Sequence, residues 1–274
     1  MSTEDNNNDN DGISNDICAN CGKEGCSSDM NTCNKCKSVK YCNAACKKKH
    51  RSKHKKACER RVAELHDEAL FKEPPNEKEE CQICFLTMPS AGQKEFKSCC
   101  GKLICSGCIY TMKEKGGKGK LDLCAFCRTP EESSDKEHMK RLKELMDKGN
   151  DWAFFQFGSY FVEGVRGMPK DINKALELWQ RAGELGCAEA YFSIGAVNSS
   201  GRGVAVDKEK AKHYYELAAM MGDETARNNL GFFEQKAGNM ERAMKHYIIS
   251  ACGGYEEALF CVQRGYKNGI VTKT

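Results

Sequence analysis

The sequence lacks any long apolar run. No stretch approaches the eighteen or so consecutive apolar residues that cross a bilayer, so it predicts no membrane-spanning segment. Residues 1–17 hold five acidic residues and no basic residue, unlike the basic start and apolar core of a signal peptide. We therefore expect the protein in the cytoplasm or the nucleus, where cysteines exist as thiols or metal thiolates and not as disulfides.

Several catalytic motifs are also missing. The chain has no Gly-rich phosphate loop, no nucleophile elbow and no His-Glu-x-x-His sequence. Their absence argues against nucleotide-dependent enzymes, hydrolases of the nucleophile-elbow type and the common zinc proteases. The Asn-rich, acidic segment 1–17 predicts a disordered tail.

Cysteine is abundant and unevenly placed. Sixteen of the 19 cysteines precede residue 128, and the last 125 residues are instead rich in Ala, Gly, Leu and aromatic side chains. This contrast predicts a multidomain protein, with two small zinc-stabilised modules followed by an all-α helical-repeat solenoid. The expected parts are the tail at 1–17, a zinc module at 18–58, a helix and linker at 59–80, a second zinc module at 81–130, a charged linker helix at 131–149 and repeats at 150–274.

Eight residues of the first block have the spacing of zinc ligands. They are Cys18, Cys21, Cys33, Cys36, Cys42, Cys46, His54 and Cys58. A C-x₂-C pair on a tight turn presents two thiolates to one tetrahedral ion, and ligands four residues apart share a helix face. Eight such ligands predict two closed sites. Cys26 falls outside this series, and we expect His50 to be an exposed helix residue.

This series, with its Tyr41-Cys42 step and closing His54-x₃-Cys58, resembles the MYND zinc finger. The resemblance implies interleaved sites, one formed by Cys18, Cys21, Cys42 and Cys46 and the other by Cys33, Cys36, His54 and Cys58. Many MYND fingers dock proline-rich peptides against a Gln and a Trp, but this chain has Lys47 and Arg51 at those positions. The resemblance therefore implies a protein-docking role without the usual peptide contacts.

A strongly basic stretch overlaps the first block. Residues 35–61 contain twelve Lys or Arg and a single acid, Glu59. The stretch is interpreted as a solvated helix face that offsets thiolate charge, or alternatively as a surface for nucleic acid or an acidic partner. The absence of interleaved aromatic residues favours the first interpretation.

A second series of eight cysteines follows. Its members are Cys81, Cys84, Cys99, Cys100, Cys105, Cys108, Cys124 and Cys127. The steps Cys81-Gln82-Ile83-Cys84 and Cys124-Ala125-Phe126-Cys127-Arg128-Thr129-Pro130 resemble the opening and closing turns of RING fingers. Most RING fingers have Cys-Gly-His where this chain has Cys100-Gly101-Lys102, and Cys99 restores the count of eight, as in all-cysteine RING fingers.

The RING resemblance implies a cross-brace of two sites. One would contain Cys81, Cys84, Cys105 and Cys108, and the other Cys99, Cys100, Cys124 and Cys127. Neighbouring side chains point apart in a strand, so Cys99 and Cys100 need a bent backbone to reach the same ion. Together the two blocks predict about four Zn²⁺ per chain.

RING fingers hold a ubiquitin-conjugating enzyme and order its ubiquitin thioester for attack by a lysine, which lowers the entropic barrier. The resemblance implies partner contacts at Ile83, at Ile109 or Tyr110, and at Pro130. Arg128 matches the position of an arginine that bridges enzyme and ubiquitin, a task that suits a planar guanidinium.

The last 125 residues contain a repeat. Ala153, Ala190, Ala226 and Ala258 recur in register, followed by Phe157, Ile194, Leu230 and Val262 and by Gly158, Gly195 and Gly231. Aromatic residues recur later in each unit, at Trp179, Tyr215 and Tyr247. This pattern predicts three helix–turn–helix units and a partial fourth, with the aromatic residues filling the gap between units.

The loops Gly164-x₂-Gly167-x₃-Asp171 and Gly201-x-Gly203-x₃-Asp207 resemble those of Sel-1-like repeats, which are related to tetratricopeptide repeats. Cys187, Cys252 and Cys261 are interpreted as small packing residues. We expect any binding surface on the concave face of the solenoid.

The combination predicts a zinc protein that resembles a RING-type ubiquitin ligase. The RING would recruit the conjugating enzyme with its ubiquitin, and the repeats and MYND finger would hold a substrate or scaffold. The alternative is a non-enzymatic, zinc-stabilised adaptor for protein–protein interaction, and nucleic-acid binding is a third possibility. The three differ in what they require: Ile83 and Arg128 matter for the first, only the metal ligands for the second, and salt-sensitive binding for the third.

Overall fold

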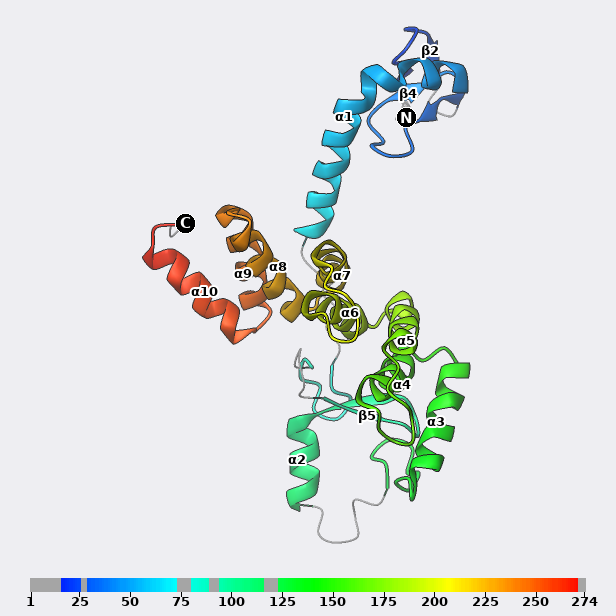
Figure 1. The fold of residues 1–274 in the computed structure, drawn as a ribbon, viewed down its shortest axis with the longest axis vertical. Helices are drawn as coiled ribbons and strands as arrows, with labels where there is room; N and C mark the ends of the chain where they lie inside the picture. Colours follow the sequence, from blue (N-terminus) through cyan, green and yellow to red (C-terminus); the bar gives the residue numbers. More distant parts are fainter. Residues whose placement is uncertain (1–15, 26–28, 73–79, 89–93, 116–122, 271–274) are drawn as a thin grey trace, which may run out of the picture. The chain divides into compact units, whose positions relative to one another are not determined.

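The computed structural model describes residues 16–25, 29–72, 80–88, 94–115 and 123–270, which divide into two units at Leu70 and Phe71 (Figure 1). Residues 1–15 of the expected tail at 1–17, Cys26, and residues 73–79 of the expected helix and linker at 59–80 lie outside the described residues. Within the described residues, no helix is both long enough and apolar enough to span a membrane.

The first unit is a small zinc-finger fold with one long helix. Two short antiparallel hairpins, β1 (Asp16–Ile17) with β2 (Glu24–Gly25) and β3 (Asn31–Thr32) with β4 (Lys40–Tyr41), precede α1 (Ala44–Leu70). Its buried cluster consists largely of cysteines, together with Met30 and Tyr41. A core this small has little apolar surface to bury, so metal ligation has to supply much of the folding free energy.

Helix α1 is continuous from the finger into the following segment. The Asn43 side chain accepts a hydrogen bond from the backbone N–H of Cys46 at 2.9 Å, which caps the helix start. The helix then carries Cys46 in its first turn, followed by His54 and Cys58, which are four residues apart and share a helix face. The expected boundary at residues 58 and 59 therefore falls inside a helix.

The second unit begins with the second cysteine block. Strands β5 (Lys94–Lys97) and β6 (Lys102–Cys105) form an antiparallel hairpin, and α2 (Ser106–Lys115) follows directly. The register pairs Phe96 with Leu103 and Lys94 with Cys105.

In the described residues, eight helices follow α2 and complete this unit, including the helix of the partial fourth repeat. They are α3 (Asp135–Asp147), α4 (Asp151–Glu163), α5 (Ile172–Leu185), α6 (Ala188–Ser200), α7 (Lys208–Met220), α8 (Glu224–Lys236), α9 (Met240–Cys252) and α10 (Glu256–Lys267). The pairs α4–α5, α6–α7 and α8–α9 are the three predicted units, and α10 is the predicted fourth first helix. Asp171 and Asp207 start the second helices of the first two units by accepting hydrogen bonds from backbone N–H groups.

The recurring glycines and aromatic residues meet inside each unit. A Cβ on Gly158 would lie 2.8 Å from Cδ1 of Trp179, and one on Gly231 would lie 2.6 Å from Cε1 of Tyr247. The glycine thus forms a notch in the first helix that seats the aromatic ring of the second helix. Two of the three rings also reach the next unit, as predicted for residues that fill the gap between units. The Tyr215 ring lies 6.0 Å from that of Phe233, and Tyr247 shares a buried cluster with Ala258 of α10.

The cysteine block and the repeats form one compact unit. The Lys94 side chain of β5 forms an ion pair with Glu189 of α6 and lies over the Trp152 ring of α4, 4.5 Å from its centroid. At the hairpin turn, Gly101 has a φ of 73°, which favours glycine, and a Cβ there would lie 2.8 Å from the Asn150 side chain. Ion pairing, cation–π contact and close packing therefore fix the hairpin on the first helices of two repeats.

The three late cysteines differ in their surroundings. Cys187 is buried and Cys261 is half-buried, as expected of small packing residues. Cys252 is exposed at the end of α9, so its interpretation as a packing residue was wrong. Cys252 is the last residue of α9 and is followed by Gly253, so no further turn of that helix covers it.

Candidate metal centres

The sixteen predicted ligands gather into four clusters of four. The clusters are Cys18, Cys21, Cys42 and Cys46; Cys33, Cys36, His54 and Cys58; Cys81, Cys84, Cys105 and Cys108; and Cys99, Cys100, Cys124 and Cys127. In each cluster the candidate ligand atoms all lie within 4.8 Å of one another. Both blocks therefore interleave their ligand pairs in space.

The spacing of the sulfur atoms fits zinc. Four thiolates at about 2.3 Å from a tetrahedral ion lie about 3.8 Å from one another. The Sγ–Sγ distances are 3.7 Å for Cys21 and Cys42, 3.8 Å for Cys33 and Cys58, 3.7 Å for Cys84 and Cys105, and 3.8 Å for Cys100 and Cys124. These separations are far longer than a disulfide bond of about 2.05 Å. The clusters are therefore compatible with four zinc ions.

The acid–base properties of the thiols also favour the binding of a metal cation. The backbone N–H of Cys42 stabilises the Cys18 thiolate and, against burial, lowers the pKa of Cys18 to about 6. The hydrogen bond to Cys46, followed by burial and the thiolate of Cys18, raises the pKa of Cys42 to about 12. Four thiolates this close cannot all ionise on their own, because each repels the next. A divalent ion removes that repulsion and allows full ionisation.

Four Cys-x₂-Cys turns share one backbone geometry. In each, the residue after the second cysteine has a positive φ: Gly22 at 73°, Lys37 at 57°, Phe85 at 56° and Arg128 at 59°. The N–H of that residue donates to the carbonyl of the first cysteine, at 2.8 Å for Phe85 and 3.0 Å for Arg128. This turn directs both thiols of a pair to the same side. Three non-glycine residues are thus held in a conformation that side chains ordinarily avoid.

The adjacent Cys99 and Cys100 lie in the turn between β5 and β6. The N–H groups of Cys100 and Gly101 both donate to the Lys97 carbonyl, at 3.2 and 2.8 Å, so the backbone bends tightly there. The bend brings both sulfurs to one cluster, with Cys99 Sγ 3.4 Å from Cys127 Sγ and Cys100 Sγ 3.8 Å from Cys124 Sγ. The required departure from a strand is therefore present.

His50 contacts the first block without joining a cluster. Its Nδ1 lies 3.2 Å from the buried Tyr41 hydroxyl, and its ring stacks on the His54 ring at a centroid distance of 5.8 Å. The expectation of an exposed helix residue was wrong, since the ring is half-buried. Tyr41 thus contacts His50, and the His50 ring packs on the imidazole of the predicted ligand His54. The Lys47 side chain donates to Asn34 at 3.1 Å, and Arg51 is exposed.

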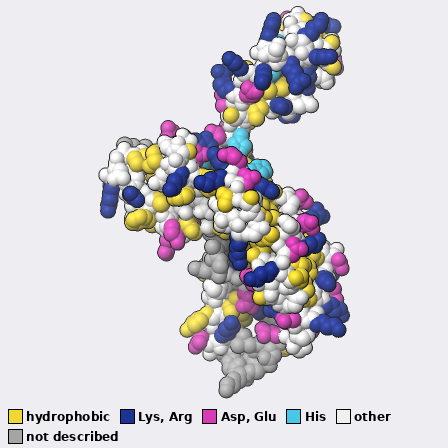
Figure 2. All heavy atoms as spheres, in the orientation of Figure 1, with side chains coloured by type: hydrophobic (Ala, Val, Ile, Leu, Met, Phe, Trp, Pro, Cys, Tyr) yellow, Lys and Arg dark blue, Asp and Glu magenta, His cyan; other side chains and the backbone are white. Residues whose placement is uncertain are grey.

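Most of the basic side chains along α1 face solvent. Lys48, Lys49, Lys53, Lys55 and Lys56 are all exposed along α1. Figure 2 shows Lys and Arg gathered over this unit. An exposed basic face agrees equally with both interpretations of the stretch, and nucleic-acid binding stays a prediction.

The predicted partner-contact residues of the second block lie on or near its surface. Ile83 is 37% exposed, Arg128 and Pro130 are exposed, and Ile109 is half-buried. Of the two alternatives on α2, Tyr110 is the exposed one, at 67%. Sequence reasoning missed Phe85 and Leu86, which are 73% and 68% exposed directly after Cys84. Two large apolar residues following a Cys-x₂-Cys pair were the available signal.

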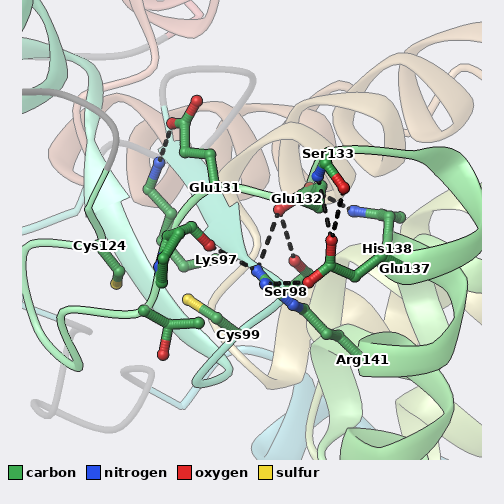
Figure 3. Close-up of polar contacts among 12 residues, drawn as sticks. Lys97, Ser98, Cys99, Cys124, Glu131, Glu132, Ser133, Glu137, His138 and Arg141 are labelled. Carbon is green, nitrogen blue, oxygen red and sulfur yellow. Dashed lines mark hydrogen bonds and ion pairs between the residues drawn. The ribbon is translucent and has the colours of Figure 1, made fainter. Parts of the chain in front are cut away.

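A polar network joins the second block to α3 (Figure 3). The Glu132 carboxylate lies 2.5 Å from Nδ1 of His138 and accepts a hydrogen bond from Ser98 Oγ at 3.3 Å. Arg141 of α3 donates to the Pro130 carbonyl at 2.9 Å and lies 3.6 Å from Glu132. The network thereby fixes the backbone just after the last cysteine of the block.

This network borders a cavity of about 390 Å³. Basic and acidic side chains both line it, among them Lys97, Arg141, Glu131 and Asp135. The Lys97 ammonium lies 2.5 Å from Glu95 and 3.9 Å from Glu131, so the charges are paired locally. The lining holds four acidic and three basic side chains, so its charges largely offset one another.

Comparisons with known proteins identify two of the modules. Residues 18–58 match the family model of the MYND finger, and residues 157–187, 188–223 and 226–255 match that of the Sel1 repeat. Residues 81–127 lie outside both matches. The MYND finger and the Sel1 repeats are thus confirmed.

Curated relatives fall into three groups. The chain is 29% identical over 113 residues (40% of this chain, 17% of the relative) to the ERAD-associated E3 ubiquitin-protein ligase component HRD3B of Arabidopsis thaliana. It is 28% identical over 114 residues (39% of this chain, 49% of the relative) to cytochrome c oxidase assembly factor 7 of Xenopus tropicalis. It is 36% identical over 66 residues (24% and 16%) to the E3 ubiquitin-protein ligase DA2 of Arabidopsis thaliana. The chain therefore spans less than half the length of each of these relatives.

One similar solved structure is that of a Sel1 repeat protein from Oxalobacter formigenes. The two chains are 27% identical, with a TM-score of 0.46 and coverage of 59% of this chain and 62% of that one.

Proposed function

We propose that the protein is a RING-type ubiquitin ligase. Residues 81–130 recruit a conjugating enzyme charged with ubiquitin, and the repeats together with the MYND finger hold a substrate or scaffold. The observation that carries this proposal is the surface of the second block, where Ile83 and exposed Arg128 stand on two metal-cluster turns of the same geometry. Two of the matched relatives carry names of ubiquitin ligases or ligase components, which supports the same function.

Each cluster is proposed to hold one Zn²⁺ through its four ligands. Zinc in such closed sites supplies folding free energy and no chemistry to the substrate. The consequence for this chain is positional. Ligation fixes the turns that carry Ile83 and Arg128, and without it neither side chain has a defined place.

Apolar contact with the conjugating enzyme falls to Ile83, helped by Phe85 and Leu86 on the same turn and by Tyr110 on α2. These four side chains are large, apolar and substantially exposed. Exposed groups of this kind on a monomer mark interaction sites more often than plain surface. Aromatic residues such as Phe85 and Tyr110 supply large contact areas at low entropic cost.

Arg128 is proposed to hold the ubiquitin of the charged enzyme in its reactive geometry. Its guanidinium offers several donors in one plane, which suits simultaneous contact with two partners. The backbone beneath it is fixed by the hydrogen bond from Arg128 N to the Cys124 carbonyl and by the contact of Arg141 with Pro130. A donor held in advance costs less entropy when the complex forms.

The test is discharge of ubiquitin from a panel of charged conjugating enzymes by the full, zinc-loaded chain. Ile83→Ala and Arg128→Ala should each lower the discharge rate by about tenfold or more, since each removes a contact central to the complex. Val206→Ala is the matched control, because Val206 is an exposed apolar residue in the repeats and should leave the rate unchanged.

Zinc content separates loss of function from loss of fold. About four zinc ions should be bound in the parent and in all three variants. Discharge by none of the enzymes despite full zinc content would refute ligase activity and leave a zinc-stabilised adaptor. An Arg128→Ala variant that discharges ubiquitin as fast as the parent chain would refute the role given to Arg128.

A further inference from the structure

The last helix of the repeats has one packed face and one uncovered face. Ala258 and Gly265 of α10 are buried, and Cys261 and Val262 pack against the cluster that includes Tyr247 of α9. Leu259 and Phe260 instead point away from α9, and they are 49% and 66% exposed. Tyr266 and Ile270 add further exposed apolar surface along the same segment.

The repeat register shows that this face corresponds to one that is covered in earlier units. Aligning Ala258 with Ala153 and Ala190 places Phe260 at the position of Phe155 and Phe192. Those two rings pack on the aromatic ring of the second helix, at centroid distances of 6.2 Å to Trp179 and 5.8 Å to Tyr215. In the described residues, no second helix follows α10, so Phe260 has no such neighbour.

The same register argues against a further repeat helix as the occupant. Gly158, Gly195 and Gly231 form the notches that let each second helix approach closely. The corresponding residue of α10 is Gln263, whose side chain blocks such an approach. The face therefore suits a helix packed at an ordinary interhelical distance of about 8–10 Å, as between two separate chains.

The charges of α10 point to a second copy of the same helix. Glu256 and Glu257 lie in its first turn, and Arg264 and Lys267 lie in its last turn. When two copies pack antiparallel, Glu256 of each faces Lys267 of the other, and Phe260 faces Gln263. Successive residues are 100° apart, so Glu256 and Lys267 lie within about 20° of each other around the helix, on the side that bears Phe260. Antiparallel packing also opposes the helix dipoles favourably.

From this geometry we infer that the protein forms a twofold-symmetric dimer through α10, with Leu259 and Phe260 of each copy packed against the other. A twofold interface is self-complementary, so each contact occurs twice. One helix face per copy is small compared with the interfaces of tight complexes. The dimer therefore dissociates readily, with a dissociation constant above about 1 μM. This inference does not depend on ligase activity.

Sedimentation equilibrium of the full, zinc-loaded chain, from micromolar to near-millimolar concentration, tests the inference. A monomer–dimer equilibrium is expected, and Phe260→Ser should weaken it by about tenfold or more. Phe232→Ser is the matched control, because Phe232 is an aromatic residue of α8 that is 52% exposed and lies outside the proposed interface. It should leave the equilibrium unchanged.

A charge exchange tests the antiparallel arrangement itself. Glu256→Lys and Lys267→Glu should each weaken self-association by roughly 5- to 30-fold, because each places like charges opposite one another twice. Mixing the two variants should restore association, since both contacts in the mixed dimer are again between opposite charges. Added salt should weaken this restored association.

Three outcomes would overturn the inference. The chain could stay monomeric across the whole range, or it could dimerise equally well with Phe260→Ser. Both charge variants could also weaken self-association without any recovery when the two are mixed. Far-UV circular dichroism of each variant shows that α10 is still folded, because both substituted charges also lie in the end turns of the helix.

Discussion

The Nε2 atom of His138 lies 2.8 Å from the Tyr160 hydroxyl, and this contact joins α3 to the first helix of the repeats. Nδ1 of the same ring faces the Glu132 carboxylate at 2.5 Å, and a carboxylate can only accept, so Nδ1 carries the proton. In the neutral ring, Nε2 then accepts from Tyr160. The imidazole is buried with both of its nitrogens satisfied, which is the condition for a polar group to stabilise a core.

Removal of the Tyr160 hydroxyl should destabilise the second unit. Tyr160→Phe leaves Nε2 of His138 buried without a partner, which costs about 1–3 kcal/mol of unfolding free energy. Urea unfolding followed by circular dichroism measures the loss. Tyr110→Phe is the matched control, because Tyr110 is exposed on α2 and the change should stay below about 0.5 kcal/mol. Equal stabilities for the two variants would contradict the assigned hydrogen bond.

Replacement of Arg128 by glycine should separate activity from stability. Arg128 has a φ of 59°, a region that costs a non-glycine residue about 1 kcal/mol or more. Arg128→Gly relieves that strain, so the melting temperature should stay the same or rise. Ubiquitin discharge should nevertheless fall as far as in Arg128→Ala. A drop in both stability and discharge would indicate that the arginine acts through the fold.

Alanine substitutions at two helical glycines should have opposite effects. Gly158→Ala pushes a Cβ to 2.8 Å from the Trp179 ring, so we expect a net loss of about 1–3 kcal/mol despite the better helix propensity of alanine. Gly107→Ala in α2 meets nothing within 4 Å, so the propensity gain of up to about 1 kcal/mol should appear there. Thermal unfolding of both variants provides the comparison. A stabilised Gly158→Ala would show that the helices do not pack as closely as described.

The buried cap of α8 should make stability depend on pH. Burial raises the pKa of Asp223 to about 7, although its carboxylate accepts a hydrogen bond from the N–H of Ala226 at 2.6 Å. Its folded-state pKa lies above the unfolded value of about 3.9, so its stabilising contribution is full below pH 4 and is lost as the pH rises through 7. Asparagine caps a helix equally well and never ionises.

Asp223→Asn should therefore gain stability over the parent as the pH rises from about 4 to 7, by on the order of 2–4 kcal/mol in all. Above pH 7 the gain should level off. Unfolding of both proteins at matched pH values measures the difference and cancels effects of zinc loss that they share. A gain that is constant over this range would show that Asp223 titrates normally.

Local spacing was enough to anticipate the clusters and the helices. Two ligands separated by two or three residues meet because a turn or a helix brings them together, whatever the rest of the fold does. The notches at Gly158 and Gly195 recur in the sequence for the same reason, since each repeat folds alike. Pattern alone did not show that the recurring aromatic rings are seated in the glycine notches of their own units, as Trp179 is at Gly158 and Tyr247 at Gly231.

Contacts between segments distant in the sequence could not be predicted from it. The pairing of His138 with Tyr160 and of Lys94 with Glu189 depends on how the second block settles on the repeats, and neither pair has a fixed spacing. The half-burial of His50 depends in the same way on the Tyr41 hydroxyl, contributed by a preceding strand. Such contacts follow from packing geometry, which a single sequence does not specify.

The anchoring of the β5–β6 hairpin on α4 and α6 has a consequence for substrate choice. Lys94 and Gly101 hold the hairpin where the first two repeats begin, so the distance between the second block and each repeat is fixed. In a ligase built this way, the second unit sets the distance between a substrate segment bound on the repeats and the lysine that can receive ubiquitin. A lysine at the right reach from the bound segment is modified, and one at another reach is spared however tightly the segment binds. Adding a repeat unit would then change which substrate lysine is modified and leave the affinity of the repeats for the substrate segment unchanged.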